Sequence, residues 1–116
     1  MERLLVCGDR NYSDQDMMYE VLKQFDTNTV IIHGNCKGAD KIAGNIAETL
    51  GMTVLKFPAL WEKYGRAAGP IRNKQMIDEG CPTLVIAFHK DIDSSKGTKN
   101  MIKQASDCEL LVILYE

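Results

Sequence analysis

The sequence lacks the features that mark several large classes of protein. Its four cysteines stand singly and form no C-x-x-C pair, which argues against a zinc ribbon and suits free thiols in a reducing compartment. No apolar run approaches the ~20 residues of a membrane-spanning helix. The opening residues, MERLLVCGDR, return to charge too soon for the apolar core of a signal peptide. We therefore expect a cytoplasmic protein with no membrane partner, bound metal or cofactor.

A strong charge of either sign is also missing. The formal net charge is −2, which argues against attraction of the whole protein to nucleic acid. One segment departs from this balance, because residues 63–74, KYGRAAGPIRNK, contain Lys63, Arg66, Arg72 and Lys74 but no acidic residue. This segment predicts either a local anion-binding patch or a solvated face.

The chain has no linker, repeat or low-complexity stretch, so its 116 residues predict one domain over 1–116. Short runs rich in Val, Ile and Leu alternate with helical segments. We expect strands at 3–7, 29–33, 53–57, 83–88 and 109–115, and helices from about residue 13, at 39–50, at 70–80 and at 97–106. Strands that are apolar on both faces and alternate with helices predict a mostly parallel sheet covered on both sides. The expected fold is a single Rossmann-like α/β domain of about five strands.

Chemically versatile residues gather after the strands. The first strand is followed by GDRNY (8–12), the second by HGNCKGAD (33–40), and the fourth by HKD (89–91) and later SKGT (95–98). Turns at the opposite edge are short and chemically plain. Ligands of open parallel sheets bind outside the carboxyl ends of the strands, so the sequence predicts a ligand site at this edge.

Glycines and helix starts in these loops suit an anionic ligand. Gly8 predicts a sharp turn or a close approach of the backbone to a ligand. Gly34 and Gly38 bracket a loop that leads into a helix, whose free N–H groups and dipole favour a phosphate or carboxylate. Gly97 and Thr98 repeat this arrangement, with a plain N-cap at Thr98 as the alternative. The loop with Gly34 and Gly38 matches neither the Walker nor the dinucleotide fingerprint, so any site depends on several loops together.

Several side chains in these loops have two interpretations each. Asp40 either caps the second helix or binds a ribose hydroxyl. His33 and His89 each end a strand at the ligand edge and are either structural or involved in proton transfer. Trp61 and Tyr64 either stack on a base or have a packing role, in the core or in a lid.

Arg72 is expected at a position that is unfavourable for a positive charge. In the first turn of a helix that starts at Pro70, a cation lies next to the positive end of the helix dipole. Such a placement indicates an anionic partner, from a ligand or from an acidic side chain. Arg66 is near enough in sequence to join it.

Four segments in this order, VCGDRNYSD, HGNCKGADKIAG, FPALWEKYGRAAGPIRNKQMI and SKGTKNMI, resemble the small cpYpsA-related SLOG (YspA-like) proteins of bacteria and phages. The resemblance spans nearly the whole chain, and the combination of H-G-x-x-x-G-A-D with G-R-A-A-G-P-I-R-N is its most specific part. The wider SLOG superfamily includes the LOG phosphoribohydrolases and the Smf/DprA DNA-processing proteins. The resemblance implies a Rossmann-like domain, a homodimer and, for a phage protein, a place in the host cytoplasm.

The resemblance also implies a nucleotide-derived ligand, such as an ADP-ribose or NAD derivative or a nucleoside phosphate. The residues and the resemblance together give an expected ligand-binding set: Gly8, Asp9, Arg10, His33, Gly34, Lys37, Gly38, Ala39, Asp40, Arg66, Arg72, Asn73, Gly97 and Thr98.

The likeness to the LOG enzymes is incomplete. Those enzymes carry a P-G-G-x-G-T-x-x-E motif, whose glutamate acts with an arginine in N-glycosidic cleavage. Here Gly97 and Thr98 match the motif and Arg72 is a counterpart candidate for the arginine, but Met101 stands at the glutamate position. A thioether can neither stabilise an oxocarbenium ion nor move a proton, so hydrolysis by that route is disfavoured.

We therefore expect a module that binds a nucleotide-derived ligand as a sensor, a sequestering agent or a regulator. The alternative is a LOG-like nucleotide hydrolase or N-glycosidase, whose catalytic candidates are Arg72, Asp9 and Asp40. A nucleic-acid role through residues 63–74, by analogy with the DNA-processing relatives, is the weakest hypothesis because four cations on an acidic chain give little affinity.

Overall fold

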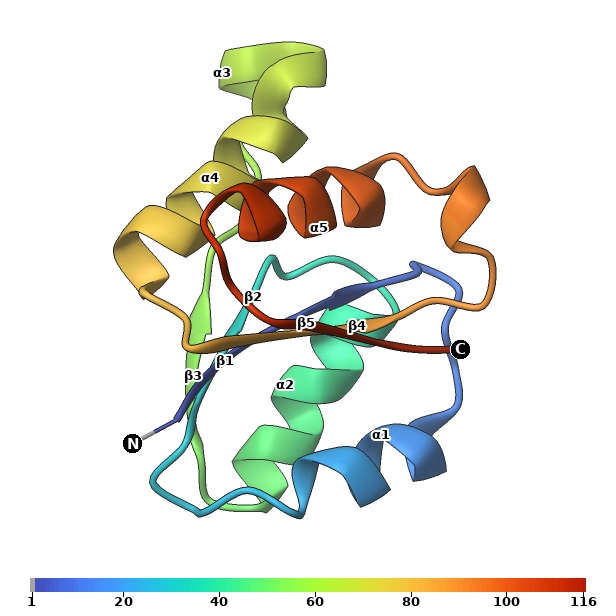
Figure 1. The fold of residues 1–116 in the computed structure, drawn as a ribbon, viewed down its shortest axis with the longest axis vertical. Coiled ribbons are helices and arrows are strands. Elements are labelled where there is room, and N and C mark those ends of the chain that lie inside the picture. The colour runs from blue at the N-terminus through green and yellow to red at the C-terminus, as the bar shows by residue number, and fades with distance from the viewer. Residues whose placement is uncertain (1) are drawn as a thin grey trace.

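The structure is a computed structural model that describes residues 2–116 and follows the predicted alternation of strands and helices (Figure 1). In chain order the elements are β1 (Arg3–Gly8), α1 (Gln15–Leu22), β2 (Val30–His33), α2 (Ala39–Thr49), β3 (Thr53–Lys56), α3 (Trp61–Tyr64), the 3-10 helix η1 (Gly65–Ala67), α4 (Ala68–Gly80), β4 (Leu84–Phe88), the 3-10 helix η2 (Ile92–Ser94), α5 (Gly97–Asp107) and β5 (Val112–Tyr115). None of the helices in the described part is long and apolar enough to cross a membrane.

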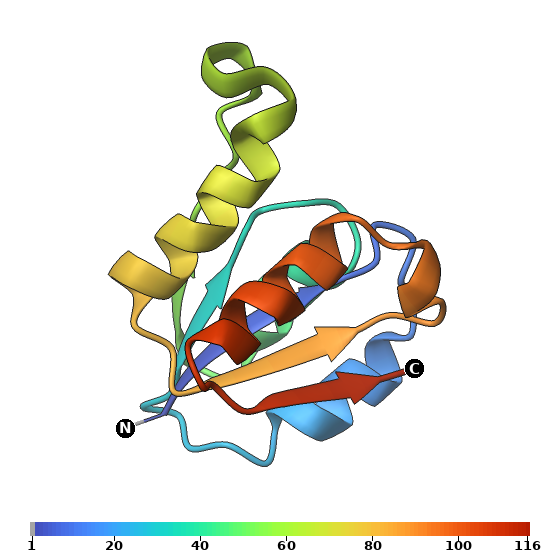
Figure 2. The same cartoon turned by 45° about the horizontal axis from the view of Figure 1, so that its top comes forward.

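The five strands form one sheet in the order β3-β2-β1-β4-β5, and every neighbouring pair is parallel. Figure 2 shows β5 at one margin of this sheet. The chain winds from β1 through β2 to β3 on one side and continues with β4 and β5 on the other, so the winding reverses between β1 and β4. Such a reversal leaves a crevice at the carboxyl ends of the strands. The predicted Rossmann-like fold is confirmed.

Alternate side chains of each strand enter two separate apolar layers. Leu4 and Val6 pack on the side of α1 and α2, whereas Leu5 packs with Met76 of α4 and Met101 of α5. Figure 1 shows these helix pairs on opposite faces of the sheet. Because both faces are covered, the strands are apolar throughout, which is the pattern that made them recognisable in the sequence.

Two boundaries differ from the prediction. Helix α1 begins at Gln15 rather than near residue 13, because the carboxylate of Asp14 accepts a hydrogen bond from the backbone N–H of Met17 at 3.1 Å and caps the helix there. Strand β5 begins later than residue 109, because Glu109 has a left-handed backbone (φ 61°) and the N–H of Leu110 bonds to Ala105 O at the end of α5.

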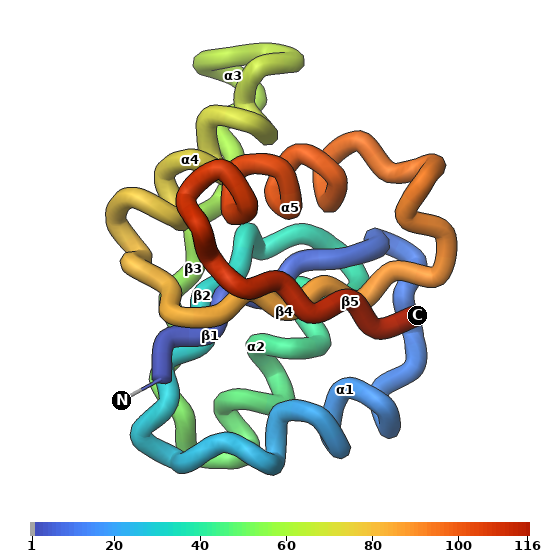
Figure 3. The backbone as a smooth tube through the Cα atoms, viewed as in Figure 1, coloured from blue at the N-terminus to red at the C-terminus, as the bar shows by residue number. Residues whose placement is uncertain are grey.

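The segment after β3 is helical earlier than expected, because the sequence predicted no helix between residues 57 and 70. It forms α3 and η1, which run directly into α4, so Pro70 is inside the first turn of α4 rather than its first residue. Residues 60–67, here called the arm, project away from the sheet (Figure 2). The tube in Figure 3 shows the chain rising from β3 into α3 and returning through α4 to β4. Neither α3 nor η1 has a buried residue.

Helix α2 approaches β2 closely at Gly44. A Cβ atom at this position would lie 2.6 Å from Nε2 of His33, and the His33 side chain is buried with only 1% of its surface exposed. The lack of a side chain at Gly44 therefore makes room for the imidazole under the helix.

We expect Gly44→Ala to lower the free energy of unfolding by about 1–3 kcal/mol, because the added methyl group overlaps the imidazole of His33. This reverses the usual gain from replacing glycine inside a helix. The matched control is Gly69→Ala in α4, whose Cβ would lie 3.5 Å from the Trp61 ring in ordinary contact, and it should be neutral or slightly stabilising. Urea denaturation of both variants measures the difference, and equal effects would contradict the packing described here.

Candidate functional site

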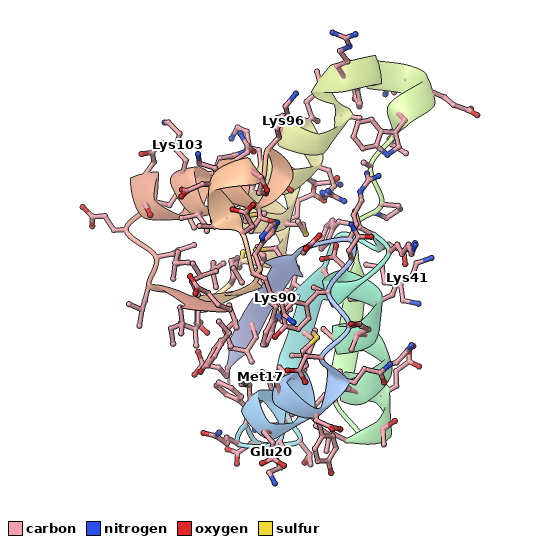
Figure 4. The ribbon with its side chains drawn as sticks, turned by 90° about the vertical axis from the view of Figure 1, so that its right-hand side faces the viewer. Met17, Glu20, Lys41, Lys90, Lys96 and Lys103 are labelled. Carbon is pink, nitrogen blue, oxygen red and sulfur yellow. The ribbon has the colours of Figure 1, made fainter. Side chains whose placement is uncertain are left out.

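A main cavity of about 540 Å³ opens at the carboxyl edge of the sheet, where the winding reverses between β1 and β4. One wall is the loop after β1, at residues 8–11. A second wall is formed by His89 after β4 and by the start of α5 at residues 95–98. Figure 4 views this edge and shows Lys90 near its middle and Lys96 on the side of α4 and α5. The cavity is within the range of about 300–1,000 Å³ typical of small-molecule sites.

The floor of the main cavity is formed by Cys7, Met76 and Met101, which all belong to the apolar layer under α4 and α5. Arg72 and Asn73 form part of the α4 side. The cavity's surroundings are thus partly apolar and partly polar, which suits a ligand with both a flat or aliphatic part and a charged part.

Gly8 lets the end of β1 lie close to the end of β4 and to the start of α2. A Cβ atom at Gly8 would lie 2.2 Å from Phe88 O and 2.8 Å from the Cβ of Ala39. The next residue, Asp9, donates its N–H to Phe88 O at 2.9 Å, and its Oδ1 accepts from the N–H of Asn11 at 2.9 Å. The close approach expected at Gly8 is therefore to the end of β4, within the protein itself.

Asp40 fastens the loop that precedes its own helix. Its Oδ2 accepts hydrogen bonds from the backbone N–H groups of Gly34, at 3.0 Å, and Cys36, at 3.3 Å. The N-cap residue of α2 is Gly38, which makes no side-chain cap. The expected helix cap at Asp40 is therefore wrong, because the carboxylate turns back toward the loop.

Burial dominates the electrostatics of Asp40. It raises the pKa of the Asp40 carboxyl to about 6, while the hydrogen bond from the Cys36 N–H and the positive charge of Arg72 act in the opposite direction. At neutral pH the carboxylate is ionised, and the two N–H groups and the nearby guanidinium offset part of its desolvation.

Arg72 is buried and binds backbone carbonyls. Its Nη1 donates to Gly34 O at 2.7 Å and to Phe57 O at 3.4 Å, and its Nε donates to Oδ1 of Asn73 at 3.0 Å. The Sγ of Cys36 lies 3.7 Å from both Nη1 and Nη2. Since α4 begins at Ala68, Arg72 also lies beyond the first residues of the helix. Of the two expected anionic partners, the acidic side chain is wrong, because the backbone carbonyls that follow β2 and β3 accept from Arg72 instead, and a ligand partner stays a prediction.

Gly34 and Asn73 extend the contacts of Arg72 to other elements. A Cβ atom at Gly34 would lie 2.2 Å from Nη1 of Arg72, so only glycine leaves room for the guanidinium. The Nδ2 of Asn73 donates to Gly97 O at 3.2 Å and to Oδ1 of Asn100 at 3.1 Å. Asn73 therefore connects α4 to the start of α5.

The N-terminus of α2 is largely occupied by the protein itself. Gly38 has φ 84°, and a Cβ there would lie 2.4 Å from the carbonyl oxygens of both Asp9 and Arg10. The N–H of Ala39 donates to Asp9 O at 3.1 Å. The loop after β1 thus takes the place that the sequence suggested for a phosphate. The structure places six expected site residues outside the lining of the main cavity: His33, Gly34, Lys37, Gly38, Ala39 and Arg66.

The N-terminus of α5 faces the main cavity and is less obstructed. The N-cap residue of α5 is Lys96, and the hydroxyl of Ser95 accepts from the N–H of Thr98 at 3.0 Å, so the alternative of an N-cap at Thr98 is wrong. A Cβ atom at Gly97 would meet no other atom within 4 Å, so this part of the wall is open. Lys96 adds a positive charge beside the positive end of the helix dipole, and both favour an anion.

The two histidines share one hydrogen-bond pattern but face different spaces. Nδ1 of His33 accepts from the N–H of Asn35 at 2.9 Å, and Nδ1 of His89 accepts from the N–H of Asp91 at 3.0 Å. The neutral imidazoles therefore carry their hydrogen on Nε2. His89 lines the main cavity, whereas His33 lines a separate cavity of about 220 Å³ beside α2. Burial, followed by the charges of nearby lysines and of Arg72, lowers the pKa of His33 to about 4.

A side cavity of about 300 Å³ adjoins the main one, and Arg10, Cys36 and Trp61 line both. Cys7 and Met76 line the main cavity and were not expected there, whereas Asp91, Ser95 and Lys96 were expected only as parts of the loops at this edge. The floor residues carry no signal in the sequence, because a cavity floor and a core position have the same apolar pattern. Within residues 2–116, no group of three or more His, Cys, Asp or Glu side chains is arranged to hold a metal ion.

We expect Asp40→Asn to become more stable relative to wild type as the pH rises from about 4 to about 7. The raised pKa means that the folded protein binds more protons than the unfolded chain between an ordinary carboxyl's 3.8 and about 6. The contribution of Asp40 to stability is therefore present below this window and is lost as the pH rises through it, by up to about 3 kcal/mol. Asparagine keeps an oxygen acceptor and does not titrate.

Urea denaturation across this pH range measures the effect, with Asp40→Ala as the comparison. Alanine leaves the N–H groups of Gly34 and Cys36 without their acceptor, so we expect Asp40→Ala to be less stable than Asp40→Asn by about 1–3 kcal/mol at every pH, because neither residue titrates. A difference between Asp40→Asn and wild type that did not change with pH would contradict the assignment.

Comparison with known proteins agrees with the resemblance found in the sequence. The model of the YspA, cpYpsA-related SLOG family matches residues 2–64, which include the loops after β1 and β2. The Gene 61 protein of Mycobacterium phage D29 is 30% identical over 124 residues, an alignment that covers 99% of this chain and 97% of that protein. The likeness to the phage protein therefore extends through α4, β4 and α5, which complete the main cavity. From these two matches, the chain belongs to the YspA, cpYpsA-related SLOG family.

Proposed function

We propose that this protein binds a phosphate-bearing, nucleotide-derived small molecule in the main cavity, as a sensor, a sequestering agent or a regulator. Nucleoside phosphates and ADP-ribose or NAD-like molecules are the candidate ligands. Membership of a SLOG family supports a nucleotide-related ligand. The position of the cavity at the reversal of the winding supports it independently, because this is where doubly wound sheets bind nucleotides.

The observation that carries the proposal is the open N-terminus of α5. The first N–H groups of a helix lack partners within the helix, and the dipole makes this end positive. At α5 this end lines the cavity, Gly97 leaves it unobstructed, and Lys96 adds a full positive charge. A phosphate at this position would be neutralised, while His89 and Asp91 on the same side offer polar contacts to a ribose.

Binding without cleavage fits the side chains better than hydrolysis. Met101 is buried at the floor of the cavity, where the LOG motif has its glutamate. The two aspartates named as catalytic candidates are engaged with the backbone: Asp40 accepts from two N–H groups of the loop at residues 34–36, and Asp9 accepts from the N–H of Asn11. The homodimer implied by the resemblance stays a prediction, which sedimentation velocity tests.

We expect Gly97→Asp to weaken the binding of AMP and ADP-ribose by at least about tenfold, because a carboxylate at the start of α5 repels the phosphate and competes for the same N–H groups. The fold should tolerate this change, since a side chain at Gly97 meets nothing within 4 Å. An acidic residue in the first turn even favours the helix by about 0.3–1 kcal/mol.

Isothermal titration calorimetry and thermal unfolding measure the two effects separately. Gly97→Asn is the matched control, because it has nearly the same size and no charge, and it should keep most of the affinity. If Gly97→Asp bound these ligands as wild type does, a phosphate site at the start of α5 would be ruled out.

We also expect the protein not to cleave nucleotides. Long incubation of the protein with AMP, NAD and ADP-ribose should leave all three intact, because no carboxylate occupies the position of Met101. Liquid chromatography detects any released base or ribose phosphate. Release of adenine or nicotinamide in proportion to protein concentration would favour the hydrolase instead.

A further inference from the structure

Trp61 occupies an unusual position at the base of the arm. It is the chain's one tryptophan, and it begins α3, whose main neighbours are η1 and α4. The side chain leaves 49% of its surface exposed and belongs to neither apolar layer of the core. Its Cη2 is near Gly69, where an added Cβ would lie 3.5 Å away. The indole therefore lies beside α4 near Gly69, and about half of the surface of Trp61 is accessible.

Core packing does not account for this side chain. Fully burying a large aromatic side chain is among the larger favourable contributions to folding, and about half of that contribution is given up here. The same indole lines both the main cavity and the side cavity, together with Arg10 and Cys36. An accessible aromatic ring at the junction of two cavities is placed to contact a ligand.

We propose that Trp61 stacks on the heteroaromatic base of the ligand whose phosphate binds at the start of α5. This inference rests on the proposed function and adds to it the residue that binds the base of the ligand. Both Trp61 and the start of α5 line the main cavity, so one molecule can contact both. Every nucleobase has a flat π-face, so an indole binds bases without selecting one of them.

The charge around the cavity agrees with this division of roles. Lys96 and the helix dipole favour an anion at the start of α5. No charged group stacks on the indole, because among the aromatic rings of the described residues only Tyr19 and Tyr64 have a lysine over them. Arg10 is exposed and, like Trp61, lines both cavities. Its guanidinium can therefore approach the base or a phosphate of the ligand. The base is thus expected on the arm and the phosphate on α5.

The test compares AMP with ribose 5-phosphate, which differ only by the base. In wild type, calorimetry should give tighter binding of AMP. Trp61→Leu should weaken AMP binding by roughly tenfold to a hundredfold, and it should leave ribose 5-phosphate binding unchanged. Trp61→Phe keeps a ring and should recover most of the loss. Because Trp61 is exposed, thermal unfolding of both variants should be close to that of wild type.

Fluorescence provides a direct second readout, because all tryptophan emission comes from Trp61. AMP should quench this emission with the same Kd that calorimetry gives, and ribose 5-phosphate should not quench it. Equal AMP affinity in wild type and Trp61→Leu would overturn the stacking role while leaving the proposed function intact. Emission that responded to protein concentration but not to AMP would overturn it in favour of a protein contact. Failure of AMP, NAD and ADP-ribose alike to bind wild type would overturn the proposed function as well.

Discussion

The buried guanidinium of Arg72 is the contact on which the rest of the site depends. It reaches the carbonyls of Gly34 and Phe57, which follow β2 and β3, and its Nε binds Asn73, which in turn binds the start of α5. A buried cation without these acceptors would be costly, so the partners must stay in place once the protein is folded. The spacing of α4, α5 and the strand ends, and therefore the shape of the main cavity, follows from this one side chain.

Asp40 binds the same loop after β2 that Arg72 binds, at residues 34–36. Its carboxylate takes the N–H groups of Gly34 and Cys36, while Arg72 takes the carbonyl of Gly34, so the turn after β2 is fixed through both its donors and its acceptor. The loop after β1 fills the N-terminus of α2 in the same way. These groups are used up by the fold itself. At the start of α5 the Thr98 N–H is taken by Ser95, but the space at Gly97 is open to the main cavity, and this is the reason that the ligand's phosphate is assigned there.

The sequence predicted the sheet well, because strands covered on both faces must be apolar, and a run such as TLVIAF fits few structures besides a buried strand. The sequence also predicted that a helix starts at Gly97 and that the chemically versatile loops lie at the carboxyl edge of the sheet. It could not identify the partners of Arg72: the helix was expected to start at Pro70 but begins at Ala68, and the acceptor Gly34 O is 38 residues away in the sequence and belongs to the backbone. Nor could it tell which way His33 faces, because both faces of a buried strand are apolar. The roles of Asp40 and Trp61 likewise depend on contacts between distant segments.

The central claim is that the main cavity binds a phosphate-bearing nucleotide derivative. Amide chemical-shift mapping tests it most directly, with ¹⁵N-labelled protein titrated with AMP, NAD and ADP-ribose. The account predicts saturable shifts, for at least one of these ligands, in the amides of residues 8–11 and 95–98, with little change at the far edge of the sheet. Absence of saturable shifts for all three ligands, or shifts confined to residues outside the main cavity, would contradict it.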